Sequence, residues 1–160
     1  MASLLCGVIM LNRLIMKIDN TLLDELTAQA QASPRLRMNM DLRNSAADTS
    51  QRMLNAIEPG SVVPIHRHRK TSETVVVLRG RAVQYLYDDE GHEASSVLLA
   101  PFGADCHVAD APRNDAQAVP AMQVEMGQWH RIEALESGTV ILEMKDGAYE
   151  PIGAEDVMER

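Results

Sequence analysis

Short stretches with turn residues between them run from Pro34 almost to the end of the chain. In the first, residues 36–42, apolar side chains occupy every second position, which is typical of a strand with one buried face. Turn pairs such as Pro59-Gly60 and Ser137-Gly138 break the sequence. This spacing predicts an all-β sandwich or barrel. Strands are expected at 36–42, Arg52–Ile57, Ser61–His66, Glu73–Leu78, Ala82–Tyr87, Ser95–Leu99, Met122–Met126, His130–Leu135 and Val140–Met144.

One helix is expected before the first strand. Asp19 or Asn20 can cap it, Leu23 and Leu26 belong to an apolar stripe, and Pro34 ends it. The apolar segment 1–15 is too short to span a bilayer, and Met16 resembles a natural start. We therefore divide the chain into an N-terminal extension (1–15), a helix (16–33), a barrel (34–151) and a C-terminal tail (152–160).

The composition excludes several classes of partner. The formal net charge of −8 and the 3% of aromatic residues argue against general binding to nucleic acid or to an anionic membrane. Cys6 and Cys106 are too few and too far apart for a disulfide framework, so a reducing, cytoplasmic location is expected. Residues 101–120 show little patterning and are expected to form a long loop.

Three histidines and one carboxylate form a candidate metal site. On a strand, His66 and His68 would project from the same face. Glu73 opens an apolar strand, where a carboxylate is out of place unless it is paired or ligating. With His130, these side chains could hold one divalent first-row metal, with Fe, Mn, Zn and Ni all open. The alternative is that Glu73 forms a structural ion pair with Arg67 or Arg81.

The spacing of these residues follows a known pattern. Gly60, His66, His68, Glu73 and Gly80 stand as G(x)5HxH(x)4E(x)6G, which resembles the first motif of the cupin superfamily. The second cupin motif is only half present, as Gly127-x-x-His130. The resemblance implies a cupin double-stranded β-helix, that is, a jelly-roll barrel with a short N-terminal helix.

Longer segments resemble one family of cupin-fold metalloproteins, the WbuC family. They are SPRLRMN (33–39), QRMLNAIEPG (51–60), ETVVVLRGR (73–81) and LESGTVILEMKDGAYEP (135–151). The resemblance implies a metal at His66, His68, Glu73 and His130, and an association with bacterial O-antigen or other surface-polysaccharide metabolism. It names no substrate. The chain departs from the family at the VEMGQWH turn and in the 101–120 loop.

A second polar group lies near the N-terminal end of the barrel. It consists of Arg35, Arg37, Asn39, Arg52 and Asn55. Some of these side chains could point into the barrel beside the metal and hold a carboxylate or phosphate. Alternatively, the polar side of this amphipathic strand faces water. The sequence leaves both readings open.

The expected function is that of a divalent-metal cupin acting on a sugar or sugar-nucleotide derivative in surface-polysaccharide metabolism. Whether it is an enzyme stays open, with isomerase-like or epimerase-like chemistry as one class. The alternatives are an Fe(II)-dependent oxygenase of small molecules and a non-catalytic ligand-binding or sensor module. The expected partner is a small ligand, anionic or sugar-derived. The apolar outer positions Val76 and Leu78 predict a homodimer.

Overall fold

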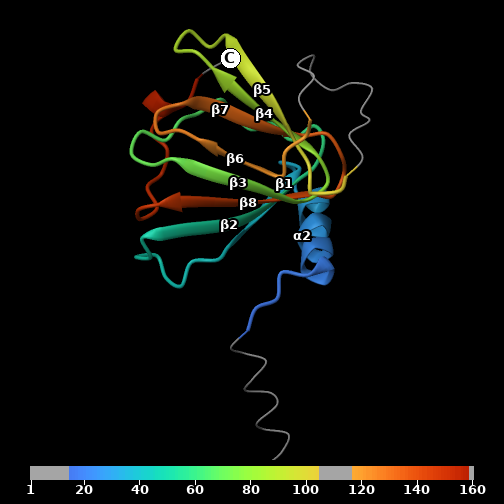
Figure 1. The fold of residues 1–160 in the computed structure, drawn as a ribbon. Helices are drawn as coiled ribbons and strands as arrows, with labels where there is room; N and C mark the ends of the chain where they lie inside the picture. Colours follow the sequence, from blue (N-terminus) through green and yellow to red (C-terminus); the bar gives the residue numbers. More distant parts are fainter. Residues whose placement is uncertain (1–14, 105–116, 159–160) are drawn as a thin grey trace, which may run out of the picture.

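The computed structural model describes residues 15–104 and 117–158, in which two antiparallel sheets form a barrel (Figure 1). The strand order is β1-β2-β8-β3-β6 in the five-stranded sheet and β5-β4-β7 in the three-stranded sheet. The strands are β1 (Arg37–Asp41), β2 (Ser50–Ile57), β3 (Glu73–Arg79), β4 (Ala82–Tyr87), β5 (Glu93–Leu99), β6 (Ala121–Val124), β7 (Trp129–Ala134) and β8 (Thr139–Asp146). The prediction of an all-β barrel preceded by a short helix is confirmed.

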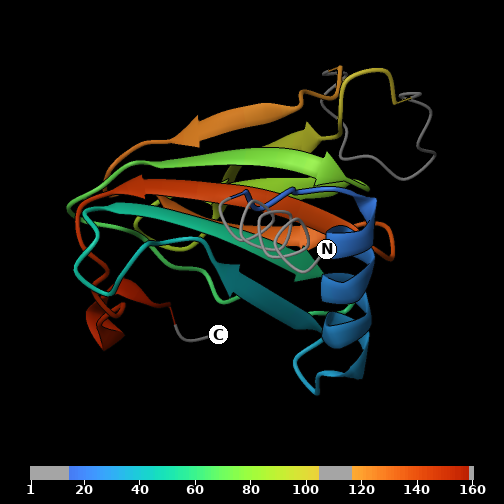
Figure 2. The same cartoon turned by 90° about the horizontal axis from the view of Figure 1, so that it is seen from below.

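The helix α2 (Asn20–Ala32) lies against the end of the five-stranded sheet (Figure 2). Asp19 caps it, since its Oδ1 accepts a hydrogen bond of 3.2 Å from the backbone N–H of Leu22. Its apolar stripe and the outer face of the sheet share one buried cluster of Leu23, Leu26, Ala30, Leu54, Ala56 and Val140. This packing leaves the opposite face of β1, β2 and β8 to the barrel interior.

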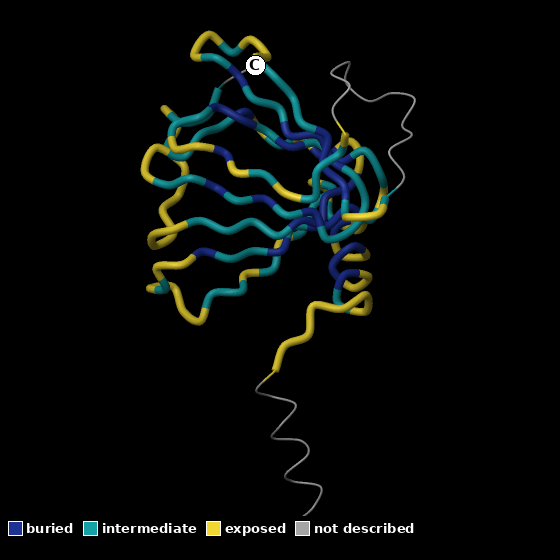
Figure 3. The backbone as a smooth tube through the Cα atoms, viewed as in Figure 1, coloured by how far each residue is buried: buried dark blue, intermediate teal, exposed yellow. Residues whose placement is uncertain are grey.

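A second cluster fills the space between the sheets where they converge near α2 (Figure 3). It contains Ile57, Val75, Val77, Ala82, Leu99, Ile132, Ala134 and Ile141. At this end, Gly80 makes the tight turn between β3 and β4 with φ of +74°. A Cβ there would lie 2.8 Å from the Cα of Thr139, so the turn requires glycine for both its conformation and its space.

The predicted strand Ser61–His66 is wrong. Only His66 pairs there, through isolated bridges to His130 and Val157, and the two histidines exchange backbone hydrogen bonds of 3.0 and 2.8 Å. Pro64 offers no N–H for a continuous ladder. His68 therefore also lies outside a regular strand, in the segment that leads to β3.

Several sequence-based expectations are not tested by this fold. Cys6, Cys106 and most of the 101–120 loop lie outside the described residues. Leu78 packs into the cluster beneath α2, so part of the apolar face that predicted a dimer is already covered. The homodimer, the cytoplasmic location and the domain bounds stay predictions. Among the described residues, no helix has the length and apolar character needed to cross a membrane.

A C-terminal segment, residues 154–157, completes the barrel mouth. The 3-10 helix η1 (Ala154–Asp156) lies close to the segment around His66. There the Asp156 carboxylate accepts hydrogen bonds from Arg67 and Arg69, and Val157 bridges to His66. The end of the chain thus closes one side of the opening into the barrel.

Candidate metal centre

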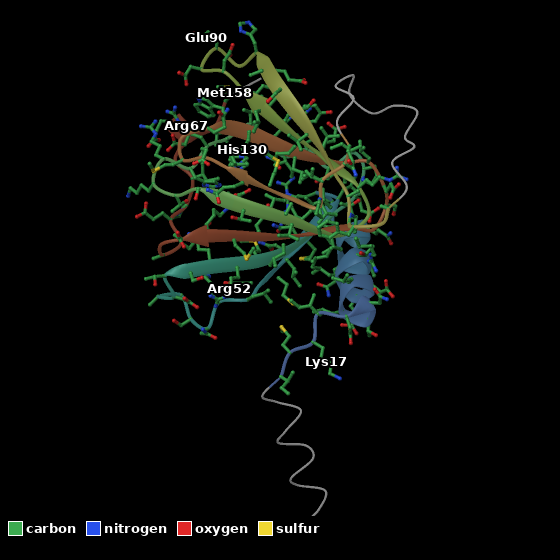
Figure 4. All side chains as sticks on the ribbon, in the orientation of Figure 1. Lys17, Arg52, Arg67, Glu90, His130 and Met158 are labelled. Atoms are coloured by element: carbon green, nitrogen blue, oxygen red, sulfur yellow. The ribbon has the colours of Figure 1, made fainter. Side chains whose placement is uncertain are left out.

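Three histidines from two distant parts of the chain, His66 and His68 from one and His130 from the other, meet inside the barrel. One ring nitrogen from each of His66, His68 and His130 lies within 4.8 Å of the others. The ring centroids of His66 and His130 are 4.4 Å apart. His130 projects inward from β7 and is 2% exposed (Figure 4). The antiparallel bridge between His66 and His130 places these two side chains next to each other, although His130 belongs to β7 and His66 lies outside any regular strand.

Backbone carbonyls fix the tautomers of two of these rings. The Nδ1 atom of His66 lies 3.0 Å from the Pro64 carbonyl oxygen, and that of His130 lies 2.8 Å from the Gln128 carbonyl oxygen. A carbonyl oxygen only accepts, so each Nδ1 carries the proton and each Nε2 presents a lone pair. The Nε2 of His130 is buried without a hydrogen-bond partner among the described residues. Such an atom is the expected donor to a cation.

The barrel interior holds these rings in their neutral form. Burial, together with the neighbouring His130, lowers the pKa of His66 to about 4. Burial also lowers the pKa of His130. Neutral imidazole is the form that binds a metal, so no proton has to leave these two rings at neutral pH.

Glu73 lies beside the histidines but is already paired. It is 4% exposed, and its Oε2 lies 2.8 Å from the Nζ of Lys145 and 3.1 Å from the Nε2 of His68. Its Oε1 lies 3.8 Å from the Nε2 of His130. Burial alone would raise the pKa of Glu73, but the contacts with His68 and Lys145 hold it well below its usual range. Glu73 is therefore a carboxylate at every pH near neutrality.

The structural ion pair that the sequence offered as an alternative has a different partner. Arg67 pairs with Asp156 at 2.9 Å, and Arg81 pairs with Glu136 at 2.7 Å. Glu73 pairs with Lys145 instead of Arg67 or Arg81, because Lys145 lies directly opposite Glu73 in the β3–β8 register. Pairing between strands that are far apart in sequence brings this cation to the centre.

Sequence reasoning missed two residues of the site, Lys145 and Glu143. Both lie on β8 and face the interior, with side chains that are 11% and 17% exposed. Burial and the nearby charge of Glu73 raise the pKa of Glu143 to about 8, although Lys145 opposes this shift. Their alternation with Leu142 and Met144 in an otherwise apolar strand was the available signal.

Among the described residues of the centre, His66 and His68 line a cavity of about 720 Å³, and His130 and Glu73 do not. Its lining also includes Glu143 and Lys145 of β8, Arg37 and Asn39 of β1, and Asn55 of β2. This volume lies within the usual range for small-ligand sites. Three members of the second polar group therefore face the barrel interior.

The other two members of that group lie elsewhere. Arg35 is exposed and does not line the cavity. Arg52 forms an ion pair of 2.8 Å with Asp48 and donates to the carbonyl of Leu42. Because residues 35 and 52 lie outside this cavity, the structure does not bring Arg35 or Arg52 to the centre.

We expect the free energy of unfolding of the metal-free protein to fall as the pH decreases from about 6.5 to about 4. The unfolded chain binds a proton at His66 in this window and the folded chain does not, so the proton stabilises the unfolded state. Urea unfolding at about pH 7 and about pH 5, after dialysis against EDTA, measures the difference.

His66→Gln should reduce this pH dependence. His92→Gln is the matched control, because the His92 side chain is 79% exposed at a hairpin and should leave the dependence unchanged. Equal pH dependence in wild type and His66→Gln would contradict the expectation.

The model of a family described as Domain of unknown function (DUF6016) matches residues 18–99, just over half of the chain. The chain belongs to this family. No curated protein matches the DUF6016 chain.

Solved structures similar to the DUF6016 chain carry cupin domains. A cupin 2 domain-containing protein from Halorhodospira halophila is 18% identical, with a TM-score of 0.51, over 73% of this chain and 68% of its own. The capsular polysaccharide assembling protein CapF from Staphylococcus aureus is 18% identical, with a TM-score of 0.53, over 71% of this chain and 27% of its own. Oxalate oxidase in complex with the substrate analogue glycolate is 11% identical, with a TM-score of 0.54, over 77% and 57%.

These likenesses show that the DUF6016 chain has the fold of cupin domains. The narrower resemblance to the WbuC family remains a prediction.

Proposed function

We propose that this DUF6016 chain is a metal-dependent cupin that binds a small molecule, with one divalent metal held by His66, His68, His130 and Glu73. The observation that carries the proposal is the buried Nε2 of His130, which has no hydrogen-bond partner among the described residues; one nitrogen from each of the three imidazoles lies within 4.8 Å of the others. Three imidazole nitrogens and one carboxylate suit Fe, Mn, Zn or Ni. A bound metal would act as a Lewis acid on an oxygen of the ligand.

Lys145 has a positioning role in this proposal. Its Nζ holds one oxygen of Glu73 at 2.8 Å, which leaves Oε1 on the side of His130. The same Nζ lies 3.8 Å from Glu143 and so ties the centre to the cavity wall. Glu143 is a carboxyl group on the cavity wall, and burial together with the charge of Glu73 raises its pKa, so it is placed to exchange a proton with a bound ligand. This supplies the acid or base that an isomerase-like or epimerase-like step needs.

We propose that the ligand is a sugar or sugar-nucleotide derivative of bacterial surface-polysaccharide (O-antigen) metabolism. The resemblance of residues 33–39 and 135–151 to the WbuC family supports this class of substrate. The fold likeness to CapF, a protein named for capsular polysaccharide assembly, is consistent with it. The cavity of about 720 Å³ has room for such a ligand.

Elemental analysis of the full chain, purified without added metal and without a histidine tag, tests the metal. We expect about one equivalent of a transition metal. Less than about a tenth of an equivalent, with no uptake during dialysis against Fe²⁺, Mn²⁺ or Zn²⁺, would contradict the proposal.

The loaded protein then separates the candidate reactions. Turnover of a sugar substrate without dioxygen, in the presence of Mn²⁺ or Zn²⁺, supports isomerase-like chemistry. Turnover that requires Fe²⁺ and consumes dioxygen favours the oxygenase alternative instead. Tight ligand binding with no turnover under either condition favours a binding module.

A further inference from the structure

Arg37 occupies a particular place on the cavity wall. It lies on β1 opposite Ile57, on the face that looks into the barrel, and lines the same cavity as His66 and His68. Its Nη1 donates to the carbonyl of Val62 and, at 3.4 Å, to the hydroxyl of Ser61. These two bonds hold one end of the guanidinium. Its Nε and Nη2 atoms donate to no residue within 15–104 or 117–158.

The charge of Arg37 is also uncompensated. Every other lysine or arginine that lines the cavity has a carboxylate partner: Arg67 and Arg69 pair with Asp156, Lys70 with Glu150, and Lys145 with Glu73. Within the described parts of the chain, Arg37 forms no such ion pair. Partial burial, and then the charge of Arg35, lower the pKa of Arg37, which agrees with a cation that has no carboxylate beside it in the described parts of the chain. A half-buried, unpaired guanidinium in a concave site attracts an anion.

We propose that Arg37 binds the carboxylate of a small ligand whose other end reaches the histidine centre. The inference rests on the proposed function in one respect, that the ligand occupies this cavity. The Nε and Nη2 atoms form the edge of the guanidinium that matches the two oxygens of a carboxylate in a bidentate pair.

The charges of the wall favour a single negative charge on the ligand. Among the described residues that line the cavity, Arg37 is the one cation without a carboxylate partner, and the same cavity is lined by acidic groups, including Glu143, Asp146 and Glu155. A nucleoside diphosphate sugar would bring at least two negative charges to this surface, whereas a sugar acid brings one. Asn39 and Asn55, which face each other across β1 and β2, offer neutral amides for hydroxyl groups. The geometry therefore points to a carboxylated monosaccharide.

Isothermal titration of the metal-loaded full chain tests the assignment, with D-glucuronate as the probe and D-glucose and D-glucose 1-phosphate as comparisons. We expect glucuronate to bind most tightly, and Arg37→Gln to weaken it about tenfold or more. Arg37→Lys keeps the charge but loses the planar fork, so its affinity should lie between those of wild type and Arg37→Gln. Arg35→Gln removes the same charge two residues away and outside the cavity, and should bind like wild type. Circular dichroism of each variant checks that it is folded.

Three results would overturn the assignment: equal glucuronate affinity in wild type and Arg37→Gln, tighter binding of glucose 1-phosphate than of glucuronate, or no binding of glucuronate. Metal content, measured on the same samples, separates this inference from the proposed function. Arg37→Gln that keeps its metal but has lost none of its affinity rejects the anchor and leaves the metal centre standing. Binding that depends on Arg37 in a chain that takes up no metal rejects the metal centre and leaves the anchor standing.

Discussion

His130→Ala is expected to lose nearly all of the metal that the wild-type chain binds. His130 is 2% exposed, its Nδ1 is held by the Gln128 carbonyl, and its Nε2 has no other described partner. Losing only the hydrogen-bond partner of a metal ligand typically costs 10- to 100-fold in affinity, so losing the ligand itself should cost at least about 100-fold. Elemental analysis and competition with a chelator give the metal content and the affinity.

Two further variants keep this result interpretable. The cavity left by His130→Ala could unfold the barrel, so a second variant, His66→Gln, changes a less buried proposed ligand. It should also lose metal. His92 belongs to a second group of possible ligands near the surface, Asp88, Glu90 and His92. His92→Ala should retain the full equivalent of metal. Full metal content in folded His130→Ala would show that the metal is bound elsewhere.

Lys145→Met is expected to destabilise the metal-free protein by about 3–5 kcal/mol. The Lys145 and Glu73 side chains are 11% and 5% exposed, and their atoms lie 2.8 Å apart. Without the ammonium group, Glu73 keeps a buried charge next to Glu143 and loses the cation that balances it. Urea unfolding of wild type and variant, both stripped of metal, measures the loss.

The matched control is Lys70→Met, which breaks an ion pair of 2.8 Å whose partners are 75% and 64% exposed. This change should cost less than about 1 kcal/mol, because water and salt screen an exposed pair. Adding Zn²⁺ or Mn²⁺ should recover more stability in Lys145→Met than in wild type, since the metal supplies the missing positive charge. Equal costs for the two lysine variants would show that Glu73 does not depend on Lys145.

Local patterns were sufficient for most of the elements. The alternation in residues 36–42 and the turn at Gly80 depend on neighbours in the sequence, so the strands and the barrel class were predictable. The segment 61–66 was not. Its apolar residues look like a strand, but Pro64 interrupts the ladder, and the pairing of His66 comes from β7 and the C-terminal tail.

The sequence by itself was sufficient to select His66, His68, Glu73 and His130 as candidate ligands, because these residue types at these sequence separations are rarely needed for packing alone. Which cation neutralises Glu73 was decided only by the tertiary structure. Lys145 is 72 residues away, and the β3–β8 register places it opposite Glu73. The same holds for Arg37: the packing of α2 on the outer face of the sheet turns Arg37 and Asn39 toward the cavity. Arg35 lies outside the cavity because it precedes β1, beyond Leu36, whose φ of +54° breaks the alternation. A period of two defines the two faces of a strand, but only the fold determines which face meets the ligand.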